Sequence, residues 1–195
     1  MSSGTIHHDD ETSPPAQPDA QQEAPRIRLK NVEKRFDGQV VLRELNTEFR
    51  PGKVTVVLGP SGSGKSVMLK HIIGLLKPDA GEVWFGETRV DTLNERQMTS
   101  VRKRIGFLFQ MGALFDSMNV QQNVEFPLQE HTKLSAAERR ERVEAMLETV
   151  GLPNILHKMP AELSGGQRKR VALARAIVLE PTAILYDEPT TGLDP

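Results

Sequence analysis

One segment constrains this chain more than any other, the run Gly59-Pro60-Ser61-Gly62-Ser63-Gly64-Lys65-Ser66. The run fits the pattern G-x-x-x-x-G-K-[ST], and it stands between a β-branched run typical of a buried strand (residues 53–58) and a helical pattern (residues 64–76). Its glycines allow backbone N–H groups to turn inward around a phosphate, and the helix start directs its positive end at the same anion. Lys65 then reaches the β- and γ-phosphates, and the Ser66 hydroxyl ligates Mg²⁺. A chance glycine-rich turn would lack this context, so the segment predicts a nucleotide site.

A second apolar run ends in two acidic residues. Residues 182–187 have the pattern of a buried strand, and Asp187 and Glu188 stand at its end. Adjacent carboxylates repel each other, so this is either a solvated strand end or a place where a cation offsets the repulsion. The phosphate loop upstream favours the cation: Asp187 holds Mg²⁺ through water, and Glu188 activates the attacking water.

Strand and helix patterns alternate along the rest of the chain. Strands are expected at residues 26–36, 39–42, 82–85 and 105–109, with Asp37-Gly38 as a hairpin turn between the first two. Helices are expected at residues 165–179 and 134–150; in the latter, Ser135 and Glu138 form a capping box and Gly151 ends the helix. This alternation predicts an α/β fold with a largely parallel central sheet.

Composition excludes several other classes. The 195 residues include no Cys, which rules out disulfides, thiolate metal ligands and a cysteine nucleophile. Lys plus Arg number 25 and Asp plus Glu 26, so a strongly basic nucleic-acid binder is disfavoured. No apolar run reaches the roughly 18 residues that a membrane span needs. Residues 1–25 are acidic and proline-rich and lack Lys and Arg, so we expect a disordered tail there.

The segment Leu163-Ser164-Gly165-Gly166-Gln167 opens an arginine-rich helix. A Ser N-cap followed by two glycines leaves backbone N–H groups at the helix start for an anion. An ordinary Ser N-cap would also explain the pattern. A chain with two such helix starts nevertheless needs a reason for the second.

Together these motifs resemble those of the ATP-binding-cassette (ABC) ATPases, from about Arg26 to Pro195. The resemblance implies a P-loop NTPase core with a parallel central sheet, an antiparallel β subdomain and an α-helical subdomain at about residues 111–163. In that family two domains pair head to tail. Each ATP lies between the phosphate loop of one copy and the Ser164–Gln167 signature of the other, which accounts for the second anion site.

The resemblance also assigns roles to single residues. Phe36 matches the aromatic position that stacks on adenine, although a strand aromatic can equally pack inward. Gln110 matches the glutamine that senses Mg²⁺ and the γ-phosphate and links to the membrane partner. Asp194, in Leu193-Asp194-Pro195, matches the loop that contacts the other subunit's site. The expected site therefore has three sets of residues: Glu188, Lys65 and Gln110 as catalytic groups; Phe36, Gly59 to Ser66, Ser164 to Gln167 and Asp194 for ATP; and Ser66, Gln110 and Asp187 for Mg²⁺.

The family's switch histidine should follow the Asp194 loop, yet all five histidines of this chain lie upstream, at positions 7, 8, 71, 131 and 157. We therefore expect residues 26–195 to be an ABC ATP-binding domain that is incomplete at its C-terminus. An incomplete domain is expected to hydrolyse ATP poorly by itself.

The stretch between Gln110 and Ser164 indicates the subfamily. Its GALF (112–115), MNV (118–120), NV (123–124), PL (127–128) and EHT (130–132) segments resemble the ATPase of Mla-type phospholipid transporters. Such ATPases work with a permease and an MCE-domain lipid-binding protein. The resemblance implies an ATPase that powers phospholipid transport between bacterial membranes, as a peripheral subunit on the cytoplasmic face of the inner membrane.

The sequence allows three other functions to be compared with this one. The cargo could be different: polar amino acids, lipoprotein release or cell-division signalling. A cassette ATPase acting on DNA or ribosomes is disfavoured, because residues 110–164 leave no room for a long coiled coil and the chain holds less than one cassette. A non-catalytic nucleotide-binding scaffold conflicts with the intact Lys65, Asp187 and Glu188. No nucleic-acid partner is therefore expected.

Overall fold

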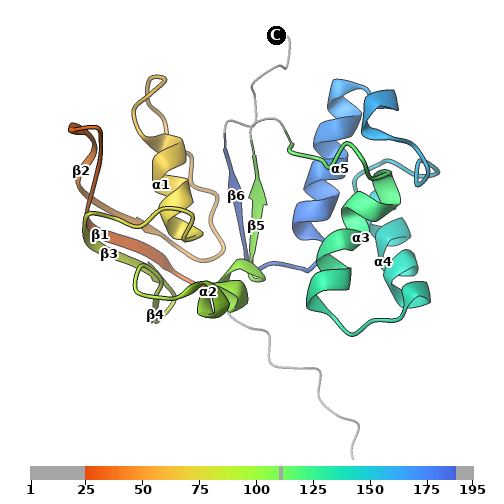
Figure 1. The fold of residues 1–195 in the computed structure, drawn as a ribbon, viewed down its shortest axis with the longest axis horizontal. Helices are drawn as coiled ribbons and strands as arrows, with labels where there is room; N and C mark the ends of the chain where they lie inside the picture. Colours follow the sequence, from red (N-terminus) through yellow and green to blue (C-terminus); the bar gives the residue numbers. More distant parts are fainter. Residues whose placement is uncertain (1–24, 110–111, 188–195) are drawn as a thin grey trace, which may run out of the picture.

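The computed structural model describes residues 25–109 and 112–187, which form two hydrophobic clusters on either side of a small parallel sheet (Figure 1). The strands are β1 (Ile27–Phe36), β2 (Gln39–Phe49), β3 (Ala80–Phe85), β4 (Thr88–Arg89), β5 (Ile105–Leu108) and β6 (Ala183–Tyr186). The helices are α1 (Lys65–Ile72), α2 (Glu95–Arg102), α3 (Val120–His131), α4 (Ala136–Thr149) and α5 (Gly165–Ile177), with a 3-10 turn at Pro160–Glu162.

The first half of the chain builds an antiparallel sheet in the order β2-β1-β3-β4. In β1 the side chains of Ile27 and Leu29 are buried, while Arg28 and Lys30 lie on the other face, as period-2 alternation requires. The expected hairpin is confirmed: Asp37 and Gly38 both have positive φ, at 49° and 82°, and Phe36 pairs with Gln39. The strand after the turn runs on to Phe49, beyond the expected end at Leu42.

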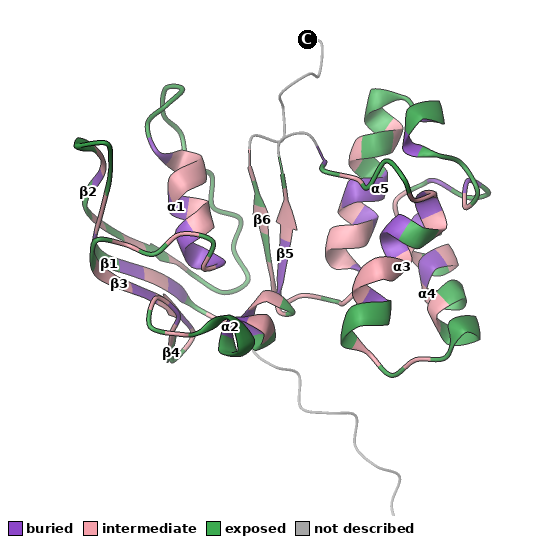
Figure 2. Ribbon diagram, viewed as in Figure 1, coloured by how far each residue is buried: buried purple, intermediate pink, exposed green. Residues whose placement is uncertain are grey.

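Helix α1 covers the inner face of this sheet. Its residues Met68, His71 and Ile72 are buried (Figure 2). Met68 and Ile72 belong to one core with Ile27, Leu29, Val83 and Phe85 of the strands. The helix ends at Ile72, four residues before the end that the sequence indicates.

Strands β5 and β6 pair in parallel, with Ile105 opposite Ala183 and Leu108 opposite Tyr186. Their carboxyl ends therefore meet at one edge. The expectation that β6 is buried is wrong, because Ile184 and Tyr186 are 41% and 44% exposed. Ile184 and Tyr186 lie on the same face of β6, and the described residues leave this face partly uncovered.

The expectation of a buried strand at residues 53–58 is also wrong. This segment has no strand assignment, and Val54 and Leu58 are 95% and 88% exposed. β-branched side chains favour extended backbone, but a strand forms only when a neighbour accepts and donates its ladder hydrogen bonds. None of the strands in the described part of the chain pairs with this segment.

The second half of the chain is helical. The expected helix at residues 134–150 is confirmed as α4, with Ser135 and Glu138 in a capping box. Helices α3 and α4 share a core with α5 that includes Val124, Leu128, Val143 and Val171. Within residues 25–109 and 112–187, no helix is long and apolar enough to span a bilayer.

Candidate functional site

The phosphate loop leads from residue 59 into α1, and two of its glycines have left-handed backbone. Gly62 and Gly64 have φ of 79° and 91°. A Cβ on Gly64 would lie 2.9 Å from Leu42 Cδ2 and 3.1 Å from the Val41 carbonyl oxygen. Glycine is therefore required at position 64 both for its conformation and for the close approach to β2.

Lys65 is the first residue of α1, and its side chain turns back over the loop. Its Nζ donates to the carbonyl oxygens of Gly59 at 2.8 Å and Pro60 at 2.9 Å. Gly64, which caps α1, supplies no side-chain hydrogen bond, so the first N–H groups of the helix are not occupied by a cap. The arrangement places an ammonium and uncapped N–H groups beside one loop, as phosphate binding needs.

Ser66 and Asp187 lie 121 positions apart in the sequence and meet in space. The Ser66 hydroxyl donates to Asp187 Oδ1 at 2.6 Å, which joins the start of α1 to the end of β6. The Asp187 backbone N–H donates to the Leu108 carbonyl at 3.0 Å, which fixes the carboxylate beside the end of β5. A hydroxyl and a carboxylate oxygen are hard donors that fit Mg²⁺, which typically takes one or two protein ligands plus phosphate oxygens and waters.

Gln110, Glu188 and Asp194 lie outside the described residues, as does the acidic tail apart from Pro25. Two of these residues follow described strands in the sequence: Gln110 comes shortly after β5, and Glu188 comes directly after Asp187. Parallel pairing puts the carboxyl ends of β5 and β6 at one edge, and the hydrogen bond between Ser66 and Asp187 joins the start of α1 to that edge.

The second anion site lies at the start of α5. The Ser164 hydroxyl accepts from the Gln167 N–H at 3.2 Å, and Gln167 Oε1 accepts from the Ser164 N–H at 3.0 Å. An added Cβ on Gly165 or Gly166 would meet no atom within 4 Å, so this helix start is open. Helices α1 and α5 stand on opposite sides of the β5–β6 pair (Figure 1). One chain therefore does not bring its two anion sites together.

Phe36 ends β1 and is 40% exposed, so the alternative in which its ring packs inward is wrong. The Lys34 ammonium lies over this ring, 5.4 Å from its centroid. Sequence reasoning missed Lys34, although its i, i+2 spacing to Phe36 on a strand places both side chains on one face.

Sequence reasoning also missed Arg175 in the last turn of α5. Its guanidinium donates to the carbonyl oxygens of Gly112 at 3.1 Å and Ala113 at 2.8 Å and to Asn123 Oδ1 at 3.3 Å. Burial lowers the pKa of Arg175, and its hydrogen-bond partners among the described residues are carbonyl and amide oxygens. The signal available was a single Arg inside an otherwise apolar helix face. These bonds fix the segment that follows Gln110 against α3 and α5.

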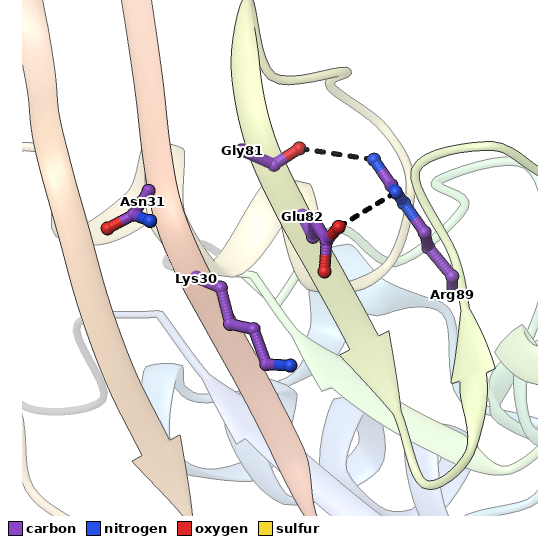
Figure 3. Close-up of a pocket in the computed structure, with 5 residues that line it drawn as sticks. All are labelled: Lys30, Asn31, Gly81, Glu82 and Arg89. Atoms are coloured by element: carbon purple, nitrogen blue, oxygen red, sulfur yellow. Dashed lines mark hydrogen bonds and ion pairs between the residues drawn. The ribbon is translucent and has the colours of Figure 1, made fainter.

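A hollow of about 540 Å³ lies apart from these residues, on the antiparallel sheet (Figure 3). Arg89 in its lining donates to Glu82 at 2.9 Å and to the Gly81 carbonyl at 3.4 Å. Asn31 accepts from Asn46 at 2.7 Å. Because these side chains already have partners and the phosphate loop lies elsewhere, the hollow is not the candidate site.

Comparisons with known proteins agree with this site. The family model described as "ABC transporter" matches residues 42–191. The chain is 46% identical to the Haemophilus influenzae intermembrane phospholipid transport system ATP-binding protein MlaF, over 87% of this chain and 64% of that protein. It is also 46% identical to the Mycobacterium leprae probable ribonucleotide transport ATP-binding protein mkl, over 87% of this chain and 49% of that protein. It thus spans about half to two thirds of the length of these relatives.

A solved structure gives the same answer for the fold. A dimeric ATP-binding cassette in a post-hydrolysis state with ADP and Pi superposes with a TM-score of 0.79 at 38% identity, over 86% of this chain and 76% of that one. The expected fold class is confirmed, with the antiparallel sheet, the parallel strands and the helical region described above for this chain. The chain belongs to the ABC transporter family, and its described residues have the fold of that family's ATP-binding cassette.

Proposed function

We propose that this chain binds and hydrolyses ATP as the ATP-binding subunit of an ABC transporter. The observation that carries the proposal is the 2.6 Å contact between Ser66 Oγ and Asp187 Oδ1. It unites the hydroxyl of the phosphate loop with the acidic strand end, the two protein groups that a nucleotide-bound Mg²⁺ requires.

Each group has a defined task. Loop N–H groups and Lys65 hold the β- and γ-phosphates, and Phe36 stacks on the adenine. Ser66, Asp187 and Gln110 are the residues that would hold Mg²⁺, whose chemistry when bound is to neutralise charge on the phosphate oxygens. Glu188 accepts the proton of a water that attacks the γ-phosphorus. The bond to the β–γ bridging oxygen breaks, and ADP and inorganic phosphate are the products.

Hydrolysis is proposed to need two copies of the chain. The open start of α5 lies across the parallel strands from Lys65, so Ser164, Gly165 and Gly166 serve the nucleotide of a second subunit. The dimeric ADP- and Pi-bound relative supports a pair of cassettes. The proposed pair is head to tail, and in it the Asp194 loop also meets the other subunit.

The proposed cargo is phospholipid. Two relatives are named for different cargoes, phospholipid for MlaF and ribonucleotide for mkl. The segments within residues 112–132 favour the phospholipid system, which brings a membrane permease and an MCE-domain lipid-binding protein as partners. The proposed location is the cytoplasmic face of a bacterial inner membrane, as a peripheral subunit.

Titration calorimetry of ATP, with and without Mg²⁺, tests the nucleotide site. We expect Mg²⁺ to strengthen ATP binding to the chain, and Asp187→Asn to remove that Mg²⁺ dependence while leaving metal-free binding. Glu141→Gln, an equal charge change at an exposed position of α4, is the control and should bind like wild type. An Asp187→Asn variant with wild-type Mg²⁺ dependence contradicts the site.

Purification of the transporter from the organism that produces this protein tests the proposed cargo. A tagged chain should retain an integral membrane permease and an MCE-domain protein, which mass spectrometry identifies, together with bound phospholipid. Recovery of a permease with a polar-solute-binding protein would instead support one of the other cargoes.

A further inference from the structure

A cation lies against the aromatic ring at the end of β1. Lys34 Nζ is over the Phe36 ring at 5.4 Å from its centroid, and Phe36 is 40% exposed. A cation on an aromatic face is attracted by the ring quadrupole. One face of Phe36 is therefore occupied by the protein, and a planar ligand can use only the opposite face.

The Lys34 side chain is held in place and is only 15% exposed. Its ammonium donates to the Lys77 carbonyl at 2.9 Å and to Asp79 Oδ1 at 2.8 Å. Asp79 is fixed in turn, because its Oδ2 accepts from the Arg35 N–H at 2.7 Å and its own N–H donates to the Glu33 carbonyl at 2.9 Å. A lysine with two anchors has lost much of the rotamer freedom that an exposed lysine keeps.

These anchors belong to the segment that leaves the phosphate-loop helix. Residues 73–79 connect α1 to β3, and the N–H groups of Leu75 and Leu76 donate to the Lys70 carbonyl in the last turn of α1. Lys34 is therefore hydrogen-bonded to Lys77, and the adjoining residues Leu75 and Leu76 are hydrogen-bonded to the helix that begins at Lys65. The ring of Phe36 and the phosphate loop are parts of one connected unit.

We propose that Lys34 is a positioning residue for the nucleotide base. Its ammonium fixes the Phe36 ring, leaves one face free for adenine, and ties that ring to the helix whose start holds the triphosphate. The inference rests on the proposed function, in which Phe36 stacks on the base. Asp79 acts behind Lys34 by fixing the ammonium.

The test measures Kd by titration calorimetry for two probes, Mg-ATP and inorganic tripolyphosphate. Lys34→Met should weaken ATP binding about three- to fivefold, the range of an exposed cation–π contact. It should leave tripolyphosphate binding unchanged, because that probe has no base. A variant that weakens both probes equally would have distorted the whole loop, and this result overturns the proposal.

The chain offers a matched control on the same strand. Lys30 Nζ lies 5.4 Å from the centroid of the Trp84 ring, and Lys30 lines the hollow on the antiparallel sheet (Figure 3). Lys30→Met removes the same charge and the same kind of contact at a site without nucleotide residues. It should bind both probes like wild type, and ATP weakening equal to that of Lys34→Met would overturn the proposal.

A double-variant cycle separates this inference from the proposed function. Phe36→Leu alone should weaken ATP and not tripolyphosphate; if ATP binding is unaffected, the stacking role of Phe36 fails. Adding Lys34→Met to Phe36→Leu should cause no further loss, since the ring that Lys34 positions is gone. Additive losses would show that Lys34 acts independently of Phe36. Asp79→Asn, which retains the side-chain shape, should shift ATP binding in the same direction by a smaller factor.

Discussion

Helices α1 and α5 both begin at a candidate anion site, but they begin in different ways. Gly64 precedes α1 in a left-handed conformation and makes no side-chain hydrogen bond to the helix. A Cβ at this position would lie 2.9 Å from Leu42 Cδ2 of β2. Ser164 caps α5 with a reciprocal bond to Gln167, and Gly165 has open space around it. The N-terminus of α1 has no side-chain cap and packs closely against β2, so it can bind a phosphate by itself. The N-terminus of α5 is capped by Ser164 and open, so it suits an anion that is bound to another subunit.

The two helices also bury a titratable side chain in opposite ways. His71 of α1 is 1% exposed, and its ring Nδ1–H donates to the Val67 carbonyl at 2.7 Å. Arg175 of α5 instead keeps its charge and is surrounded by three oxygens and the Phe115 ring, 5.3 Å away. Burial penalises both charged forms, so α1 excludes the charge and α5 solvates it with carbonyl groups.

The largest effect is expected from Arg175→Leu. The carbonyl groups of Gly112 and Ala113 and the Asn123 side chain would lose their donor, and Ala113 would keep a left-handed φ of 47° with less to hold it. We expect the free energy of unfolding to fall by about 3 kcal/mol, measured by urea unfolding. Arg175→Lys should recover part of it. A loss below about 0.5 kcal/mol would mean that Arg175 does not fix this segment.

The second-largest effect is expected from Lys65→Ala, which distinguishes the N-terminus of α1 from that of α5 as the ATP-binding site of a single chain. Removing a charge-assisted donor to phosphate should weaken Mg-ATP binding by about 30-fold, roughly 2 kcal/mol, in titration calorimetry. Ser164→Ala should leave ATP binding to a single chain unchanged, because its helix start lies across the parallel strands. If both variants weaken binding equally in the monomer, the distinction between the two starts is lost.

A Gly→Ala pair compares the two starts without changing charge. Gly64→Ala forces a Cβ to 3.1 Å from the Val41 carbonyl at a φ of 91°, so we expect about 1–2 kcal/mol of destabilisation. Gly165→Ala meets nothing within 4 Å and should be neutral or stabilising by up to about 1 kcal/mol. Thermal unfolding of both variants checks the prediction, which fails if Gly165→Ala is the more damaging change.

The sequence alone located the elements whose pattern is local. The loop glycines, the Asp37-Gly38 turn and the Ser135 cap each depend on residues a few positions apart, and each lies where expected. The prediction of a strand at residues 53–58 was wrong because strand formation depends on a neighbouring strand far along the chain, which periodicity does not reveal.

The candidate site divides in the same way. The motif types predicted Ser66 and Asp187, and the structure joins them across 121 positions. The roles of Lys34 and Arg175 were not predicted, because a Lys or Arg in a sequence ordinarily indicates a side chain whose charged end lies in solvent. Their roles depend on partners such as Asp79, Asn123 and Gly112 that only the folded chain brings near. Pairing of distant polar groups is the part of a site that sequence patterns do not contain.

The smallest expected effect is the pH dependence of stability that arises from the buried His71 of α1. Burial lowers the pKa of His71 below its ordinary value of 6.5, and its Nε2 has no hydrogen-bond partner in the described part of the chain. The unfolded chain therefore binds a proton more readily than the folded one, so stability is full above pH 6.5 and falls as pH drops from 6.5 toward the folded pKa.

Urea unfolding at pH 7.5 and pH 6 measures this loss, which cannot exceed about 1.4 kcal/mol per pH unit and should be below about 1 kcal/mol here. His71→Asn keeps an N–H for the Val67 carbonyl but does not titrate, so its stability should change less between the two pH values than that of wild type. Carboxyls whose pKa is lowered, such as Asp79 and Glu138, titrate well below this window. If His71→Asn loses as much stability as wild type on acidification, the buried imidazole of α1 is not the group that senses pH.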